Sequence, residues 1–111
     1  MDLYNQLSAL LEQLNISIRS LRKTGQEYAE AERDYRMALS AEILRMEGDG
    51  RPVTNIYNIA RGTKKVAEAK YKQIATEAVY KANMEAIQGI KLQIRVIQAQ
   101  IDKEYGANLS D

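Results

Sequence analysis

The sequence contains no cysteine, histidine, phenylalanine or tryptophan, and it has a single proline. Without cysteine and histidine, the chain cannot supply a disulfide, a thiol nucleophile, an imidazole base or a zinc site of the usual Cys/His type. Without phenylalanine and tryptophan, its core must be built from Leu, Ile, Ala and half-polar Tyr, of which there are seven. This composition favours thin helical packing over a thick globular core.

Long hydrophobic runs are also missing. No apolar stretch approaches the roughly 20 residues that cross a bilayer. The N-terminal segment MDLYNQLSALLEQL has neither the basic start nor the cleavage site of a signal peptide. A chain of 111 residues that is 45% hydrophobic and 28% charged is typical of one folded domain. We therefore expect a single cytoplasmic domain over residues 1–111.

The N-terminal half carries a heptad pattern that predicts a long helix over about residues 2–47. Ser17 and Thr24 fill two positions of this seam, and the pattern continues in phase through Gly25, where the sequence leaves open whether the helix is continuous. The apolar positions follow one another in steps of three, four or seven: Leu3, Leu7, Leu10, Leu14, Leu21, Tyr28, Ala31, Tyr35 and Ala38.

A second long helix is expected over about residues 63–105, ended by Gly106. Its first face is marked by Val66, Ala67, Tyr71, Ile74 and Ala78, and isoleucines at helical spacing follow from residue 87 to residue 101. The segment IKLQIRVIQAQI (90–101) also alternates with period two, which leaves a strand open, but helical spacing on both sides favours a helix. The prediction is an all-α fold of two long antiparallel helices that assemble into an oligomeric helical bundle.

The corner between these helices, residues 48–62, concentrates the unusual residues of the chain. Gly48-Asp49-Gly50 is typical of a turn, and Pro52 disfavours helical geometry at the preceding residue. Thr54 is expected to cap a short helix over residues 55–61. Gly62 is expected to stop that helix, and Thr63 to cap the second long helix.

Positive charge is concentrated at the same place. Residues 1–50 carry six basic and nine acidic side chains, whereas residues 51–81 carry seven basic and two acidic ones. We expect a small phosphorylated ligand here for three reasons. Two helix N-termini and several basic side chains attract phosphate, a tyrosine can stack on a base, and two asparagines can pair with the polar edges of a base or ribose. The predicted nucleotide or anion site comprises Arg51, Thr54, Asn55, Tyr57, Asn58, Arg61, Thr63, Lys64 and Lys65. Tyr28 or Tyr71 could complete the pocket from a neighbouring chain.

Simpler explanations stay open for each of these features. The corner residues could serve only as caps, packing residues and solvated charges. The pattern TNIYNIARGTKKVAEAK also has a rough likeness to a helix-turn-helix motif, although its second helix is far too long for one. Glu27, Glu30 and Asp34 share a helical face, but a second acidic pair for a metal is missing, and nearby arginines favour an exposed salt-bridged surface. No catalytic residue, cofactor or metal is expected.

A series of short motifs runs through roughly residues 26–105: Y-x-x-A…Y-R-x-A-L, then G-x-P-V-T, I-A-R-G, V-A and A-x-Y-K-A. In these motifs the sequence resembles small helical proteins encoded by phages and prophages of Firmicutes. The resemblance brings no catalytic residues. It implies a homo-oligomeric anti-defence protein that sequesters a cyclic nucleotide immune signal without turnover. Direct inhibition of a host defence enzyme by protein binding is the first alternative, and DNA binding is the second.

Overall fold

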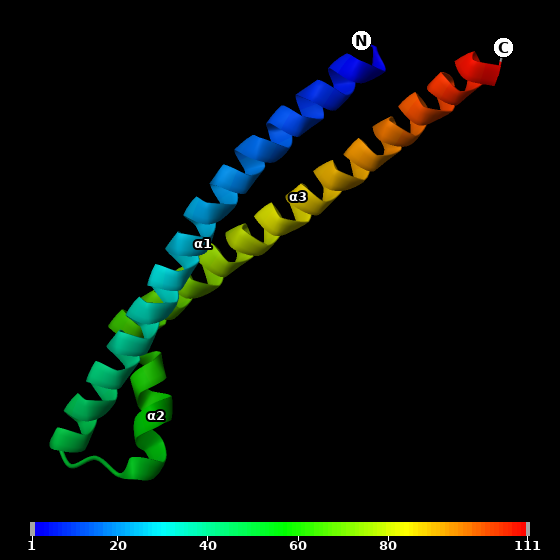
Figure 1. Cartoon of the computed structure of the whole chain (residues 1–111). Helices are drawn as coiled ribbons and strands as arrows, with labels where there is room; N and C mark the ends of the chain where they lie inside the picture. The colour runs from blue at the N-terminus through cyan, green and yellow to red at the C-terminus, as the bar shows by residue number, and fades with distance from the viewer. Residues whose placement is uncertain (1, 111) are drawn as a thin grey trace. The chain divides into compact units, whose positions relative to one another are not determined.

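The computed structural model describes residues 2–110 and the side chains of residues 2–106, and the chain is all-α over this range. Figure 1 shows three helices: α1 (Leu3–Gly48), α2 (Val53–Gly62) and α3 (Lys64–Ser110). A long first and a long third helix on either side of a short one were predicted, and this is confirmed. Residues 1 and 111 of the predicted domain lie outside the described range.

The ends of α1 are fixed by local hydrogen bonds. The backbone N–H of Asn5 donates to Asp2 Oδ1 at 2.7 Å, so Asp2 caps the first turn. At the other end, Gly50 has φ 75° and donates to the Glu47 carbonyl at 3.0 Å, while the Arg51 N–H donates to the Met46 carbonyl at 3.3 Å. This pair of bonds is a Schellman motif, which needs a residue with positive φ and therefore favours glycine.

Several predicted helix ends are wrong in detail. Thr54 does not cap α2, because the helix begins at Val53, two residues before the predicted start, with Pro52 in the N-cap position. Gly62 is the last residue of α2 and does not adopt positive φ. Thr63 alone is extended between α2 and α3, and its hydroxyl donates backwards to the Ala60 carbonyl at 2.7 Å. Gly106 does not end α3, which continues to Ser110.

The chain divides into two compact units. The end unit comprises Met1–Lys23 and Lys81–Asp111, and the corner unit comprises Thr24–Tyr80. In the end unit, Asn83 Nδ2 donates to the Ser17 carbonyl at 3.3 Å. In the corner unit, the Tyr28 and Tyr80 rings pack with centroids 6.0 Å apart, and Lys70 lies over the Tyr35 ring. Within the corner unit these contacts pair increasing residue numbers on α1 with decreasing numbers on α3, so its two long segments are antiparallel.

The heptad seam predicted on α1 is confirmed. Every predicted seam position is half-buried or buried, including Ser17 and Thr24, and burial is deepest at Ala31 and Tyr35. The helix runs through Gly25 without a break. A Cβ at this position would lie 3.0 Å from Cε1 of Tyr80, so a close approach of that ring accounts for the glycine.

The first face predicted for α3 is wrong beyond Val66. Tyr71 and Ile74 are 76% and 56% exposed, and Ala67 and Ala78 are also exposed. The covered positions instead repeat in alternating steps of three and four and are polar over much of the corner unit. They are Val66, Ala69, Gln73, Thr76, Tyr80, Asn83, Ile87, Ile90, Ile94, Ile97 and Ile101.

The short helix α2 completes the core of the corner unit. Met46 of α1 is buried together with Ile56 and Ala60 of α2, and Leu39 and Ile43 pack against them. Ile56 and Ala60 of α2 thus face α1, and the other residues of α2, polar and apolar, are left exposed. This orientation decides which corner side chains are available to a ligand.

Candidate functional site

The outer surface of α2 presents most of the predicted ligand residues to solvent. Ile56 and Ala60 are buried, and the residues between and beside them are exposed. Because a helix turns by about 100° per residue, burying these two positions leaves the remaining ones spread around the other faces of α2. These exposed residues are Thr54, Asn55, Tyr57, Asn58 and Arg61.

One hollow in the corner unit collects part of this set. It has a volume of about 360 Å³ and combines Asn58, Arg61 and Gly62 of α2 with residues of both long helices. Those further residues are Tyr35 of α1 and Ala67 and Lys70 of α3. Its lining contains two cations, an amide and a phenol ring, with no acidic side chain. The volume falls in the range of small-molecule sites, roughly 300–1,000 Å³.

The two cations of the hollow are positioned by aromatic rings. Arg61 Cζ lies 5.5 Å from the centroid of the Tyr57 ring, one turn earlier on α2. Lys70 Nζ lies 4.6 Å from the centroid of the buried Tyr35 ring and donates to Gln73 Oε1 at 2.9 Å. Such cation–π contacts hold a charge in place without neutralising it. Arg61 and Lys70 are therefore held in a defined orientation at the hollow.

Two of the predicted basic residues lie at a different place. Arg51 and Lys65 act on Glu42, whose pKa is lowered first by a hydrogen bond from Arg45 and then by the charges of Arg45, Arg51 and Lys65. Lys65 also borders a separate hollow that contains Asp34. Arg51 and Lys65 are thus close to carboxylates, which compete with an anionic ligand. The structure does not bring the basic corner residues into one cluster.

The remaining predicted residues do not gather around the hollow. Lys64 is exposed at the start of α3, and Thr54 and Asn55 lie in the first turn of α2. Thr63 joins α2 and α3 through the bond to the Ala60 carbonyl. The ring of Tyr28 packs on Tyr80, and Tyr71 is 76% exposed.

The place of Tyr35 and Lys70 in the lining of this hollow was not predicted from the sequence. Tyr35 was assigned to the seam, where it is indeed buried, but one face of its ring is covered by Lys70. Lys70 could have been found from its place one turn after Val66 on the same side of α3. This inference requires the covered positions of α3 to be known, and the apolar pattern does not reveal them because several of them are polar.

The acidic face of α1 forms local ion pairs. Gln26 Nε2 donates to Glu30 Oε1 at 3.1 Å, and Arg33 pairs with Asp34 at 3.2 Å. Within residues 2–106 no group of three or more Asp and Glu side chains is arranged to hold a metal ion. Across the described residues, no helix is both long and apolar enough to cross a membrane.

Comparison with protein-family models, with curated proteins and with solved structures gives no match to the chain. Its own geometry is therefore the basis for a functional proposal.

Proposed function

We propose that the protein binds a small phosphorylated ligand, of the class of cyclic nucleotides, in the hollow between α2 and the long helices, and sequesters it without catalysis. The observation that carries this proposal is the lining of the hollow, where Arg61 and Lys70 converge with Asn58 and no carboxylate is present. Arg61 and Lys70 can each form a charge-assisted hydrogen bond with phosphate, and the Asn58 amide can pair with a polar edge of the ligand.

The roles of the side chains follow from their chemistry. Arg61 presents a planar guanidinium that can bind two phosphate oxygens at once, whereas Lys70 supplies a compact point charge. Asn58 can both donate and accept, as base and ribose edges require. Tyr35 forms part of the wall, and Tyr57 lies on the far side of Arg61, where it restricts the rotamers of that arginine.

The proposal narrows the site expected from the sequence. Arg51 and Lys65 contribute only to the long-range positive potential, because Glu42 and Asp34 lie close to them. Thr54, Asn55, Thr63 and Lys64 are not assigned a ligand contact. The proposed biological role, an anti-defence protein of phage type acting in the host cytoplasm as a homo-oligomer, rests on the sequence resemblance described above.

Isothermal titration calorimetry tests this function. The ligands are a panel of cyclic dinucleotides and cyclic ADP-ribose isomers, with inorganic pyrophosphate as a probe of phosphate recognition alone. We expect binding of at least one nucleotide that weakens with rising salt, without turnover of the ligand when the mixture is analysed by chromatography. If every ligand gives neither heat nor a shift of the thermal midpoint, the proposed function is wrong.

Direct protein binding is the second candidate function, and a different observation favours it. Several large apolar side chains of the corner unit are strongly exposed, among them Val53 at 80%, Leu44 at 67% and Tyr71 at 76%. Exposed apolar side chains mark an interaction surface where they form a contiguous patch, and this candidate function places the partner protein on these residues. DNA binding receives less support, because a single extended residue joins α2 to a 47-residue α3, whereas helix-turn-helix motifs use a turn of about 3–4 residues.

A further inference from the structure

One flank of the helix pair in the end unit carries no charge over residues 6–20 of α1 and 82–100 of α3. On each helix, two stripes at heptad spacing lie on either side of the covered seam. On this flank the stripes reach charged residues only beyond these ranges, at Asp2, Lys23 and Lys103, and within the ranges they contain only small, apolar and uncharged polar residues, of which all but Gln6 are exposed. We call this surface the uncharged strip; it consists of Gln6, Ala9, Gln13, Ile16 and Ser20 of α1 and Ala82, Ala86, Gly89, Gln93, Val96 and Gln100 of α3.

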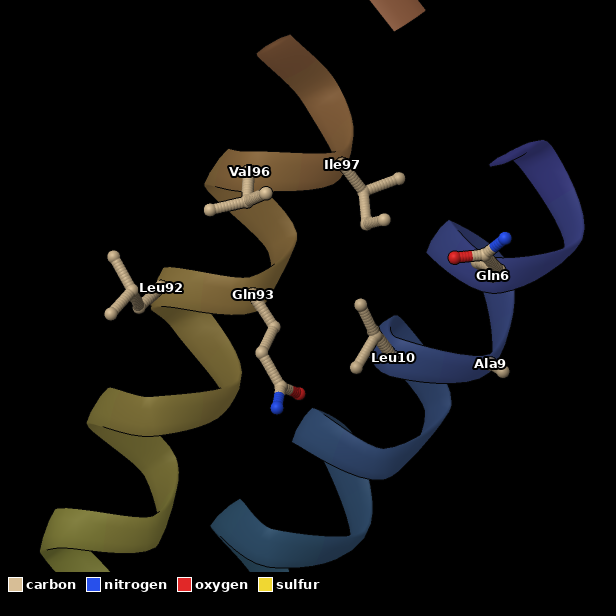
Figure 2. A pocket seen from close by; sticks show the side chains of 7 residues that line it. All are labelled: Gln6, Ala9, Leu10, Leu92, Gln93, Val96 and Ile97. Carbon is tan, nitrogen blue, oxygen red and sulfur yellow. The ribbon is translucent and has the colours of Figure 1, made fainter. Parts of the chain in front are cut away.

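The uncharged strip is hollowed between the two helices. A groove of about 490 Å³ lies there, bordered mainly by apolar side chains. Figure 2 shows Leu10 of α1 and Ile97 of α3 pointing into the space between the helices, with Gln93 beside them. Leu92 and Val96 border the groove on the α3 side and are 55% and 49% exposed. A single chain therefore leaves part of its seam and the adjoining apolar stripe uncovered.

Gly89 lies in the middle of the uncharged strip without a reason inside the chain. A glycine within a helix lowers its stability relative to alanine. At Gly25 the Tyr80 ring explains the absence of a side chain, but a Cβ at Gly89 would meet nothing within 4 Å. With Ala82 and Ala86 on the same stripe, Gly89 provides a surface that another helix can approach closely. The glycine thus points to a partner outside the single chain.

The opposite flank differs in charge. Over residues 6–20 of α1 and 82–100 of α3 it carries Lys91 and Arg95 and no acidic residue. A twofold interface brings one surface against itself, so a flank with charges of one sign repels its copy. The uncharged strip has no such repulsion, and its glutamine amides can both donate to and accept from identical amides.

We propose that a second copy of this chain packs on the uncharged strip and forms a four-helix bundle from two end units. The α3 part of the strip extends over 18 residue steps, or about 27 Å at 1.5 Å per residue. The whole strip also includes α1, and the axes of two packed helices lie about 10 Å apart. Such a surface buries on the order of 500 Å² per chain, or about 1,000 Å² in total, which is the lower limit for a biological interface. This inference rests on the self-association included in the proposed function and not on any ligand.

Sedimentation velocity over a range of protein concentrations tests the proposal on the full chain. We expect a dimer for the unchanged protein. Ala86→Glu should raise the dimer dissociation constant by about 100-fold or more, because two like charges would be buried in one interface. Gln88→Glu adds the same charge to α3 on the opposite flank, outside the strip, and should leave the dimer unchanged.

A bulky substitution provides a second, uncharged test. Gly89→Leu should dissociate the dimer by blocking the close approach of helices, and Gln88→Leu is its matched control. Circular dichroism checks that each variant remains helical. A monomeric unchanged protein, or a dimer that withstands both Ala86→Glu and Gly89→Leu, would overturn the proposal. Calorimetric titration of the same variants separates the dimer proposal from the proposed ligand binding, because ligand binding in the corner unit does not require this strip.

Discussion

Gly25 of α1 lies directly under the ring of Tyr80 of α3, and a Cβ on Gly25 would be 3.0 Å from Cε1 of that ring. The ring also packs on the ring of Tyr28, with centroids 6.0 Å apart. The glycine is thus a contact residue of the helix pair, placed where α3 carries its largest seam side chain. A helix that would gain stability from alanine keeps glycine here because of packing.

Replacing Gly25 by alanine is expected to destabilise the protein. The new methyl group must displace the Tyr80 ring, which costs about 1–3 kcal/mol in a packed site and exceeds the gain of about 1 kcal/mol from helix propensity. Urea unfolding followed by circular dichroism measures the difference. In a Tyr80→Ala background the same substitution should become stabilising, and equal effects in both backgrounds would contradict the contact.

Truncation of Met46 to alanine is expected to lower the free energy of unfolding by about 2–5 kcal/mol, because it empties a buried site. Met46 is 1% exposed and contacts the buried face of α2. Leu44→Ala, two residues away at a side chain that is 67% exposed, should change stability by no more than about 0.5 kcal/mol. Similar losses for both variants in urea unfolding would show that α2 does not cover Met46.

Asn83 places a polar side chain in the seam of the end unit, where it donates to the Ser17 carbonyl at 3.3 Å. Polar residues at seam positions specify register and lower stability. Asn83→Leu should therefore raise the thermal midpoint of unfolding, by the equivalent of about 1 kcal/mol. Asn15→Leu, at an exposed position, is the control. A midpoint that falls for Asn83→Leu would show that the hydrogen bond outweighs the apolar gain.

The pairing of Glu42 with Arg45 predicts a specific pH dependence. Arg45 lowers the pKa of Glu42 below its ordinary value of 4.5, so the ionised carboxylate stabilises the folded state. This contribution is complete above the ordinary value and is lost as the pH falls through the lowered one. Glu42→Gln should lower the thermal midpoint at neutral pH, and the difference should shrink as the pH falls through the lowered pKa of Glu42. A difference that stays constant with pH would contradict the pairing.

Parts of this fold can be predicted from sequence because the responsible residues are apolar and regularly spaced. The seam of α1 is such a case, since Leu, Tyr and Ala occupy nearly all of its positions. The seam of α3 in the corner unit could not be found in this way. There Gln73 and Thr76 are covered, while Tyr71 and Ile74 are exposed. Polarity misleads when a seam contains amides and hydroxyls that pair locally.

The candidate site could be predicted only in part for a related reason. Asn58 and Arg61 were expected because they lie in the unusual corner segment, and both line the hollow. Tyr35 and Lys70 come from helices whose register relative to α2 is set by packing, and no local pattern reveals it. Some basic residues line the hollow and others lie near Glu42. This arrangement likewise depends on which face of α2 is buried, and the buried face is the one that carries Ile56 and Ala60.

The affinity of charge-matched variants tests the central proposal most directly. Arg61→Gln with Lys70→Gln removes two positive charges from the hollow, and Arg51→Gln with Lys64→Gln removes two from the surrounding corner. Calorimetric titration with the best-binding cyclic nucleotide and with pyrophosphate should show a loss of at least about 100-fold for the first pair, equivalent to roughly 3 kcal/mol, and only a few-fold loss for the second. Equal losses for the two pairs would show that binding follows the general positive potential of the corner and would contradict a site at Arg61 and Lys70.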